Sequence, residues 1–281
     1  MSNDTEHAAD HPPYQQHYFR NMVQQSQSTL LGIWLFMAQE IMFFGGLFAA
    51  YAWNRAAYPE AFVLGSRLMA VGIGAFNTVV LIASSFTIVL AVNAARHGQK
   101  NKIILWFVAT LIFGGAFLGI KKVEYAAKFE KHVVPGALGT APFDLAYGFA
   151  KDYSHNPEPY EAEEENGFPK VAPGTFDAAH ADSHGHKHFE KGAPGSRDYF
   201  ASIISKENQK AAAIYFSLYF AMTGMHALHM VIGVGLAIWI MILAKKGVFS
   251  PGYYPHVEYF GLYWHCVYIV WIFLFPLLYL I

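Results

Sequence analysis

The chain has 281 residues, of which 54% are hydrophobic and 14% are charged. The charged fraction lies well below the roughly 25% usual for soluble domains, so the composition predicts a membrane protein. The net charge of −1 leaves no basic surplus for nucleic acid. The single cysteine, Cys266, excludes an intramolecular disulfide and any multi-cysteine metal site.

Five apolar segments are long enough to cross a bilayer, which takes roughly 20 apolar residues in a helix. Irregular backbone or open strands would leave polar groups unpaired in lipid, so we expect helices. The sequence therefore predicts an all-α, polytopic membrane protein built as a five-transmembrane-helix bundle. In chain order, the apolar segments are Leu30–Trp53, Leu68–Val92, Ile103–Ile120, Ala211–Ala244 and Tyr259–Ile281.

The chain divides into four regions. A long segment between helices 3 and 4 holds most of the acids and has few long apolar runs, so it cannot bury a large core alone. We expect an extramembrane insertion, partly ordered against the bundle. No cleavable signal peptide is visible, so the first span must direct insertion. The regions are a polar N-terminal tail (1–28), transmembrane helices 1–3 (29–128), the acidic, histidine-containing insertion (129–208) and transmembrane helices 4–5 (209–281).

Glu40 lies at the middle of the first apolar segment. A charged group there costs roughly 2.5–3.5 kcal/mol on insertion scales, so it indicates a functional or assembly role. The simpler interpretation is a protonated acid that hydrogen-bonds to a neighbouring helix. Both interpretations require a partner helix and hence a packed bundle.

Three histidines lie well inside the last two spans. His226 and His229 are three residues apart and share a helix face, while His265 lies in the fifth span. A metal or haem site needs several convergent ligands, and these histidines do not form one. We expect them to hydrogen-bond between helices or to lipid headgroups, with Glu40 or Glu258 as partners.

Charged residues also follow the spans. Glu124 is expected to mark the membrane boundary and has the spacing for ion pairs with Lys121 and Lys128. Basic or polar groups at span ends are expected to meet phospholipid headgroups between the first two spans and the last three. These groups are Arg55, Arg67, Arg96 and His226.

The insertion carries a histidine-rich run. Its imidazoles are weak candidates for binding zinc or copper, and a solvated run is the favoured interpretation. One alternative function is therefore a metal-binding or copper-delivery protein. The candidate residues are His180, His184, His186 and His188.

Motifs in all five spans resemble subunit III of haem–copper cytochrome c and quinol oxidases, in its five-helix form. The resemblance excludes about the first thirty residues and the insertion, and Tyr268 stands where the family commonly has aspartate. The motifs are Ile33–Phe44, Phe76-Asn77-Thr78, Ala83–Thr87, Phe117–Ile120, Val123-Glu124-Tyr125, Gly224–Gly233, Tyr263-Trp264-His265 and Val270–Phe275.

The resemblance implies a chain with no catalytic residue, haem or copper of its own. Haem and copper are expected in partner subunits, with subunit I as the main contact and subunit II nearby. Members of the family hold phospholipids and support proton uptake and the stability of the complex. Glu40 matches the buried glutamate of the family. A cytochrome c or another respiratory complex is a further expected partner, through 129–208.

Loop charges favour a bacterial-type cytoplasmic membrane protein with its N-terminus inside and its C-terminus outside. The family pattern supports the same orientation. Two alternatives stay open: the accessory subunit of a quinol oxidase or nitric oxide reductase, or an independent proton-coupled carrier that uses Glu40. Copurification with a haem-bearing partner would separate the subunit from the carrier.

Overall fold

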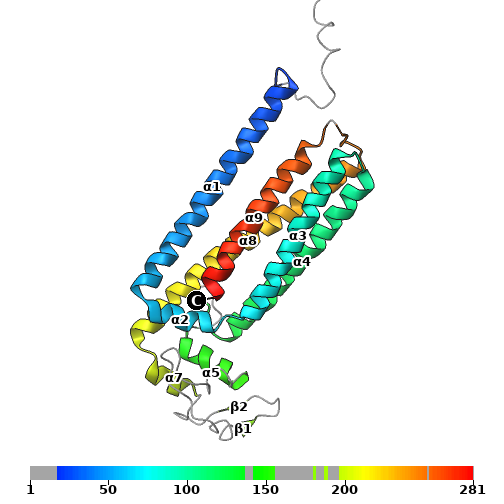
Figure 1. The fold of residues 1–281 in the computed structure, drawn as a ribbon. Helices are drawn as coiled ribbons and strands as arrows, with labels where there is room; N and C mark the ends of the chain where they lie inside the picture. Colours follow the sequence, from blue (N-terminus) through cyan, green and yellow to red (C-terminus); the bar gives the residue numbers. More distant parts are fainter. Residues whose placement is uncertain are drawn as a thin grey trace, which may run out of the picture.

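The computed structural model describes residues 18–136, 142–155, 180–181, 187–188, 196–251 and 253–280. Five of its helices are long and apolar enough to cross a membrane (Figure 1). The prediction of an all-α bundle with five spans and an insertion between the third and fourth is confirmed. The five helices are α1 (Met22–Ala57), α3 (Val71–Arg96), α4 (Lys100–Glu130), α8 (Lys206–Lys245) and α9 (Pro255–Tyr279).

Three of these helices, α1, α4 and α8, extend beyond the predicted apolar segments at both ends, because polar residues continue them. Asn21 caps α1 by accepting a hydrogen bond from the Gln24 amide at 2.8 Å, and Ser205 caps α8 in the same way at 3.0 Å. These side chains satisfy amides that have no partner within a helix. Proline at the start of α9 is tolerated because no helical hydrogen bond is lost there.

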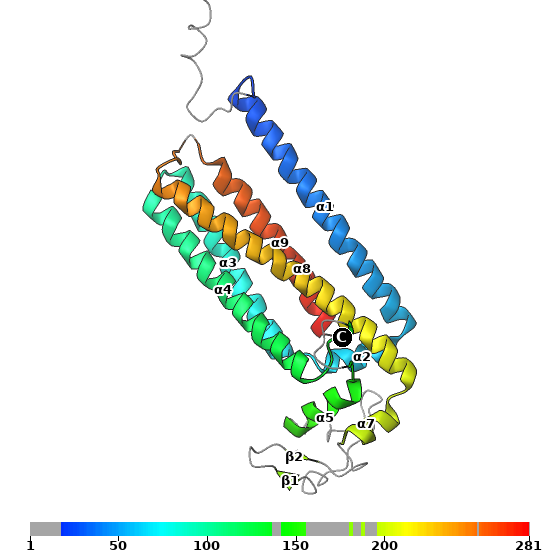
Figure 2. The ribbon, with the colours of Figure 1, turned by 180° about the vertical axis from the view of Figure 1, so that it is seen from behind.

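Helices α3, α4, α8 and α9 form a closely packed group, and α1 stands apart from it. Helix α1 contacts α8, α9 and the short helix α2 (Pro59–Arg67). It departs from the others toward its N-terminal end, as both views show (Figures 1 and 2). Only 11% of the most apolar window of α1 is buried, against 50% for α9.

Aromatic rings fill the interior, and glycines make room for one of them. Trp264 and Trp271 of α9 are both fully buried. A Cβ at Gly233 would lie 2.7 Å from the Trp264 ring, so this position needs glycine, and one at Gly114 would lie 3.2 Å from the same ring, a tight contact. Gly45, by contrast, has nothing within 4 Å, so the packing role expected of the small residues does not apply there.

A second layer covers the bundle end where α9 stops (Figure 1). It comprises α2, which is not among the helices predicted from the sequence, with α5 (Leu145–His155) and α7 (Arg197–Ile203) from the insertion. Helices α5 and α7 pack through the buried rings of Phe149 and Phe200, whose centroids lie 5.8 Å apart. Two residue pairs, β1 (His180–Ala181) and β2 (Lys187–His188), run antiparallel.

Ion pairs connect this layer to the end of α4. Lys131 pairs with Asp152 of α5, and Lys151 lies 3.6 Å from Glu130. Arg197 donates to Asp144 at 2.6 Å, which joins the starts of α7 and α5. The described helices of the insertion are thus held against the chain's own bundle.

Candidate functional site

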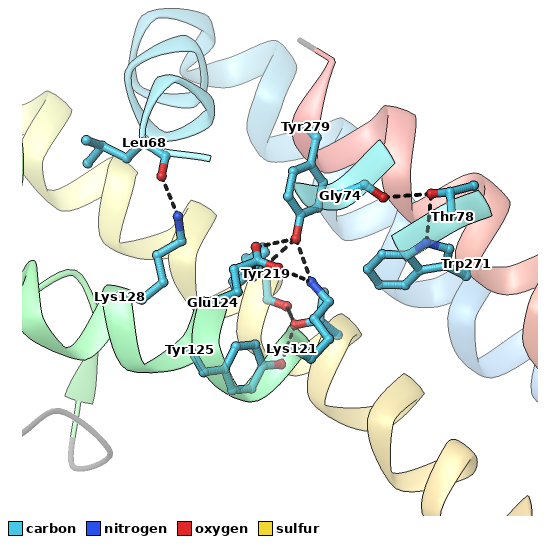
Figure 3. A network of polar contacts seen from close by, with 11 residues as sticks. Leu68, Gly74, Thr78, Lys121, Glu124, Tyr125, Lys128, Tyr219, Trp271 and Tyr279 are labelled. Atoms are coloured by element: carbon cyan, nitrogen blue, oxygen red, sulfur yellow. Dashed lines mark hydrogen bonds and ion pairs between the residues drawn. The ribbon is translucent and has the colours of Figure 1, made fainter. Parts of the chain in front are cut away.

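A lysine and a glutamate form a buried polar cluster with two tyrosines inside the bundle. We call Lys121, Glu124, Tyr219 and Tyr279 the lysine–glutamate cluster (Figure 3). Lys121 donates to one Glu124 oxygen at 2.7 Å. The other Glu124 oxygen accepts from Tyr219 at 2.7 Å and from Tyr279 at 2.5 Å. The two charged residues are 4% and 3% exposed.

Three helices bring the lysine–glutamate cluster together. Lys121 and Glu124 lie one turn apart on α4, while α8 supplies Tyr219 and α9 supplies Tyr279. Lys121 also donates to the Tyr279 hydroxyl at 2.6 Å and lies 4.6 Å from the centroid of the Trp271 ring. Such a pair is tolerated in a low-dielectric interior because its hydrogen bonds are made. This arrangement joins three helices through one set of hydrogen bonds.

Further polar contacts extend from the lysine–glutamate cluster toward the second layer. Lys128, which is 3% exposed, donates to the Leu68 carbonyl rather than to Glu124. Tyr125 and Thr223 join α4 to α8 at 2.6 Å. The i,i+3 ion pair of Glu124 is present, but its carboxylate lies inside the protein and not at an exposed boundary.

A second polar cluster lies where α1 meets α8, at the middle of both helices. We call Glu40, His226 and His229 the glutamate–histidine cluster. Nε2 of His229 lies 3.0 Å from Oε2 of Glu40. The two groups are close enough for an ion pair, but their orientation does not give a directed hydrogen bond. Nδ1 of His229 lies 2.8 Å from the Met225 carbonyl, which orients the ring.

His226 is 1% exposed and is packed between aromatic rings. The centroid of its ring is 5.4 Å from that of Phe117 and 5.1 Å from that of Trp271. Neither ring nitrogen has a hydrogen-bond partner among the described residues. The expectation that His226 reaches a lipid headgroup is wrong, because the side chain is enclosed at the middle of α8.

The remaining candidates in the spans lie apart from both clusters. His265 is half-buried, with Nε2 3.4 Å from the Ser85 carbonyl. Arg96 pairs with Glu258 at 3.2 Å on the exposed end of α3. Arg55 is exposed at the end of α1 and Arg67 is half-buried at the end of α2. The three arginines therefore lie at two opposite ends of the bundle.

The histidine-rich run falls mostly outside the described residues. His184 and His186 lie outside them, whereas His180 and His188 are backbone partners in the β1–β2 register. Within the described part of the chain, no group of three or more histidine, cysteine or carboxylate side chains is placed to hold a metal ion.

An open cleft lies between α1 and the α8–α9 pair. A cavity of about 650 Å³ at its mouth has polar lining that includes Ser26, Thr29 and Tyr259. A second cavity of about 360 Å³ is lined mostly by apolar side chains, among them Phe36 and Trp239. The cleft separates α1 alone from the other helices, so the expected division between the first two spans and the last three is wrong.

Sequence reasoning did not identify Tyr219 and Tyr279 as polar partners. Both are tyrosines within apolar segments, where aromatic residues ordinarily indicate packing or an interfacial position. A usable signal was present in Lys121, which follows the third apolar run directly and precedes Glu124 by one helical turn. Buried charges so close to a span require hydrogen-bonding side chains from the facing helices.

Comparison with known proteins gives one family and several curated relatives. The sequence model described as cytochrome c oxidase subunit III matches residues 14–151 and 200–281. Quinol oxidase subunit 3 of Bacillus spizizenii is 26% identical over 90% of this chain and 86% of its own length. Cytochrome c oxidase subunit 3 of Thermostichus vulcanus is 22% identical over 98% of this chain and 92% of its own length.

The family model does not match the whole of the insertion. Residues 152–199 are not matched, whereas most of α5 and the end of α7 are. The unmatched segment is thus shorter than the 129–208 insertion inferred from the apolar pattern.

Proposed function

The chain belongs to the cytochrome c oxidase subunit III family, and from this premise we propose that it is the accessory subunit III of a respiratory haem–copper terminal oxidase. Such an oxidase reduces oxygen and couples the reaction to proton pumping. This chain performs no redox step in the proposal. It supports proton uptake and the stability of the complex. The match across all five spans carries the proposal.

Membership of an oxidase complex implies other oxidase subunits as partners. We place subunit I as the main contact and subunit II nearby, with haem and copper held in those partners. Relatives named quinol oxidase and cytochrome c oxidase both match the chain over most of its length. The proposal therefore covers either electron donor, since this subunit does not receive electrons itself.

The cleft beside α1 supports the proposed binding of phospholipid. It opens between a helix that is mostly exposed and the packed α8–α9 pair. Its apolar part suits acyl chains, and tyrosines and hydroxyl groups at its mouth suit a headgroup. Lipid there would cover the half-buried apolar side chains of α1 that line the cleft, Ile33 and Phe36.

The proposed location is a bacterial-type cytoplasmic membrane, with the N-terminus inside and the C-terminus outside. The basic residues Arg96, Lys100 and Lys245 lie at helix ends on the same side as the start of α1 (Figure 1). Positive charge in short loops favours the cytoplasmic side. The second layer and the insertion then lie on the outer side.

Copurification in mild detergent tests the proposed function. The expected result is a complex with haem absorbance that contains this chain at a fixed ratio, while the isolated chain shows no haem absorbance. A stoichiometric haem in the single-chain preparation, or a chain that purifies alone from intact membranes, would contradict the assignment.

A further inference from the structure

The last turn of α9 carries backbone carbonyls that have no partner within the helix. Two of them are paired by tyrosines from other helices. The Tyr51 hydroxyl of α1 donates to the Leu277 carbonyl at 2.6 Å. The Tyr215 hydroxyl of α8 donates to the Leu278 carbonyl at 2.7 Å. Consecutive residues of α9 thus hold two different helices.

The next residue, Tyr279, connects the same turn to α4 (Figure 3). Its hydroxyl donates to Glu124 at 2.5 Å and accepts from Lys121 at 2.6 Å. We call Leu277, Leu278 and Tyr279 the α9 end turn. Its three residues contact α1, α8 and α4 in succession, each through a hydrogen bond with a buried side chain.

Aromatic packing adds α2 to this junction. Phe62 of α2 meets both tyrosine rings edge-on, with its centroid 5.1 Å from that of Tyr51 and 5.4 Å from that of Tyr215. A Cβ at Gly65 of α2 would lie 2.4 Å from a ring carbon of Tyr215. All three rings are fully buried, so close packing holds the two tyrosine hydroxyls at the α9 end turn.

Helix α1 depends on the α9 end turn more than the other spans do. It is the least buried of the five, with 11% of its most apolar window covered, and its contacts with other spans are mainly with α8 and α9. Buried hydroxyl and carbonyl groups are costly to leave unpaired in an apolar interior. Without the α9 end turn, Tyr51 would lose its hydrogen bond to α9 and α1 would keep a sparse set of contacts.

We propose that the α9 end turn is a lock shared by α1, α4 and α8, so that loss of its contact with α4 also loosens α1. The turn is one piece of helix, and a displacement of Tyr279 moves the Leu277 carbonyl with it. The first of the five spans is therefore held in place by the last. The proposal concerns contacts within this chain, so it is tested independently of the proposed function, which concerns partner subunits.

Distance measurements between spin labels on α1 and α3 test the lock in the intact complex in lipid nanodiscs. Helix α3 is the reference because it makes none of these hydrogen bonds. The labelled positions are Trp53 of α1 and Phe76 of α3, both exposed, and the buried Cys266 is replaced by serine in every form. The labelled parent should give one narrow distance distribution. Tyr51→Phe removes a single hydroxyl and should broaden it.

Tyr279→Phe is the decisive variant, because the lost hydroxyl contacts α4 and not α1. Independent contacts would leave α1 in place, whereas a shared lock broadens the distances between α1 and α3. Tyr259→Phe is the matched control. It removes the hydroxyl of an exposed tyrosine of α9 that reaches α1 at 3.4 Å, at the Ser26 carbonyl, and the distribution should stay narrow.

A second pair of variants reaches the lock from α2 and keeps every hydroxyl. Gly65→Ala places a methyl group against the Tyr215 ring and should displace its hydroxyl from the α9 end turn, so the distribution should broaden. Gly45→Ala in α1 is the matched control, because nothing lies within 4 Å of the added Cβ, and the distribution should stay narrow.

A narrow distribution in Tyr279→Phe overturns the proposal, because the hydrogen bonds of the α9 end turn then act separately. A narrow distribution in Tyr51→Phe also overturns it. So does a Tyr259→Phe distribution as broad as that of Tyr51→Phe, because any hydrogen bond between α1 and α9 would then suffice. If Tyr279→Phe does not accumulate in the membrane, Gly65→Ala decides: a broad distribution supports the lock and a narrow one rejects it.

Discussion

At the scale of single residues, the two polar clusters differ in how completely their groups are paired. Every Glu124 oxygen has a donor, and its Lys121 partner also reaches Tyr279. Glu40 has His229 nearby but no directed hydrogen bond at Oε2. The first cluster is therefore fully paired by side chains of three helices, while the second leaves polar atoms without a hydrogen-bond partner among the described residues.

Glu124→Gln should strongly destabilise the subunit. The substitution leaves the Lys121 ammonium buried without its counter-charge, which costs about 3–5 kcal/mol. The thermal unfolding midpoint of the purified complex should fall clearly. Glu258→Gln is the control, because the exposed Arg96–Glu258 pair contributes only about 0–1 kcal/mol.

A double substitution distinguishes the free-energy cost of an unpaired buried charge from the cost of altered packing. Lys121→Met with Glu124→Leu removes both charges together, and apolar replacement of a buried pair is often neutral. The unfolding midpoint should recover relative to Glu124→Gln alone. A single variant as stable as the wild type would show that the ion pair does not hold the bundle.

Substitutions of Glu40 should separate hydrogen-bonding shape from charge. Glu40→Gln keeps the shape of the side chain and should leave assembly nearly intact. Glu40→Leu leaves Nε2 of His229 without its partner, at a cost of about 1–3 kcal/mol, and should loosen α1. Subunit retention and turnover lifetime in detergent measure both effects. If the leucine variant matches the wild type, Glu40 has no assembly role.

At the scale of elements, α5 and α7 form a small unit supported by the bundle. Phe149, Tyr153 and Phe200 are fully buried, and Phe143 lies 5.9 Å from Phe216 of α8, measured between ring centroids. The Tyr147 ring stacks on His132 at 4.3 Å. These aromatic residues pack mainly against the chain's own helices.

Phe149→Ala should release α5 without disrupting the membrane helices. Loss of a buried phenylalanine costs about 3–5 kcal/mol, and here the loss falls on a short unit outside the spans. Limited proteolysis followed by mass spectrometry should show faster cleavage between 142 and 205. Ile203→Ala, at a partly exposed site of α7, should change the cleavage little. Equal cleavage of both variants would show that the Phe149 contact is unimportant.

The sequence predicted the spans well because lipid imposes one requirement on all of them: long apolar helices. It could not predict that Glu124 would be buried in the protein, with hydroxyl partners from α8 and α9. Charges that follow an apolar run give no sign of the side chains that the facing helices supply. The nine residues of α2 begin at Pro59, which also fits a simple turn, so that helix was missed. Both failures arise from packing between distant segments.

At the scale of the whole molecule, the segment 152–199 is the part not matched by the family model. Four glutamates lie in one short run of it: Glu161, Glu163, Glu164 and Glu165. The aromatic residues Phe149 and Tyr153 of α5 are buried inside the chain. The negative charge of the four glutamates is therefore the feature of the insertion that we expect to attract a partner. We expect these glutamates to attract a basic electron carrier electrostatically, over a distance that shortens as the ionic strength rises.

Replacing 157–194 with a short Gly/Ser linker tests this role. The yield of the complex should be normal, because α5 and α7 remain. The apparent Michaelis constant for a basic carrier should rise at low salt, and the difference should fade above about 0.1 M ionic strength. Substituting the four glutamates with glutamine is the matched control for charge and should reproduce the effect. Lower yield at every salt concentration would instead indicate a permanent structural contact, and no change in either would show a tolerated linker.

The unequal attachment of α1 has a mechanical consequence. Near its C-terminal end, the Tyr51 hydroxyl donates to the Leu277 carbonyl at 2.6 Å, and Tyr51 is fully buried. Near its N-terminal end, the cleft intervenes and Tyr259 reaches the Ser26 carbonyl only at 3.4 Å. Helix α1 is therefore firmly attached near its C-terminal end and only weakly attached near its N-terminal end. We expect its displacement to increase toward the N-terminal end. In the proposed function phospholipid fills the cleft, so we expect a change in membrane lipid to alter the durability of the subunit without any change in its residues.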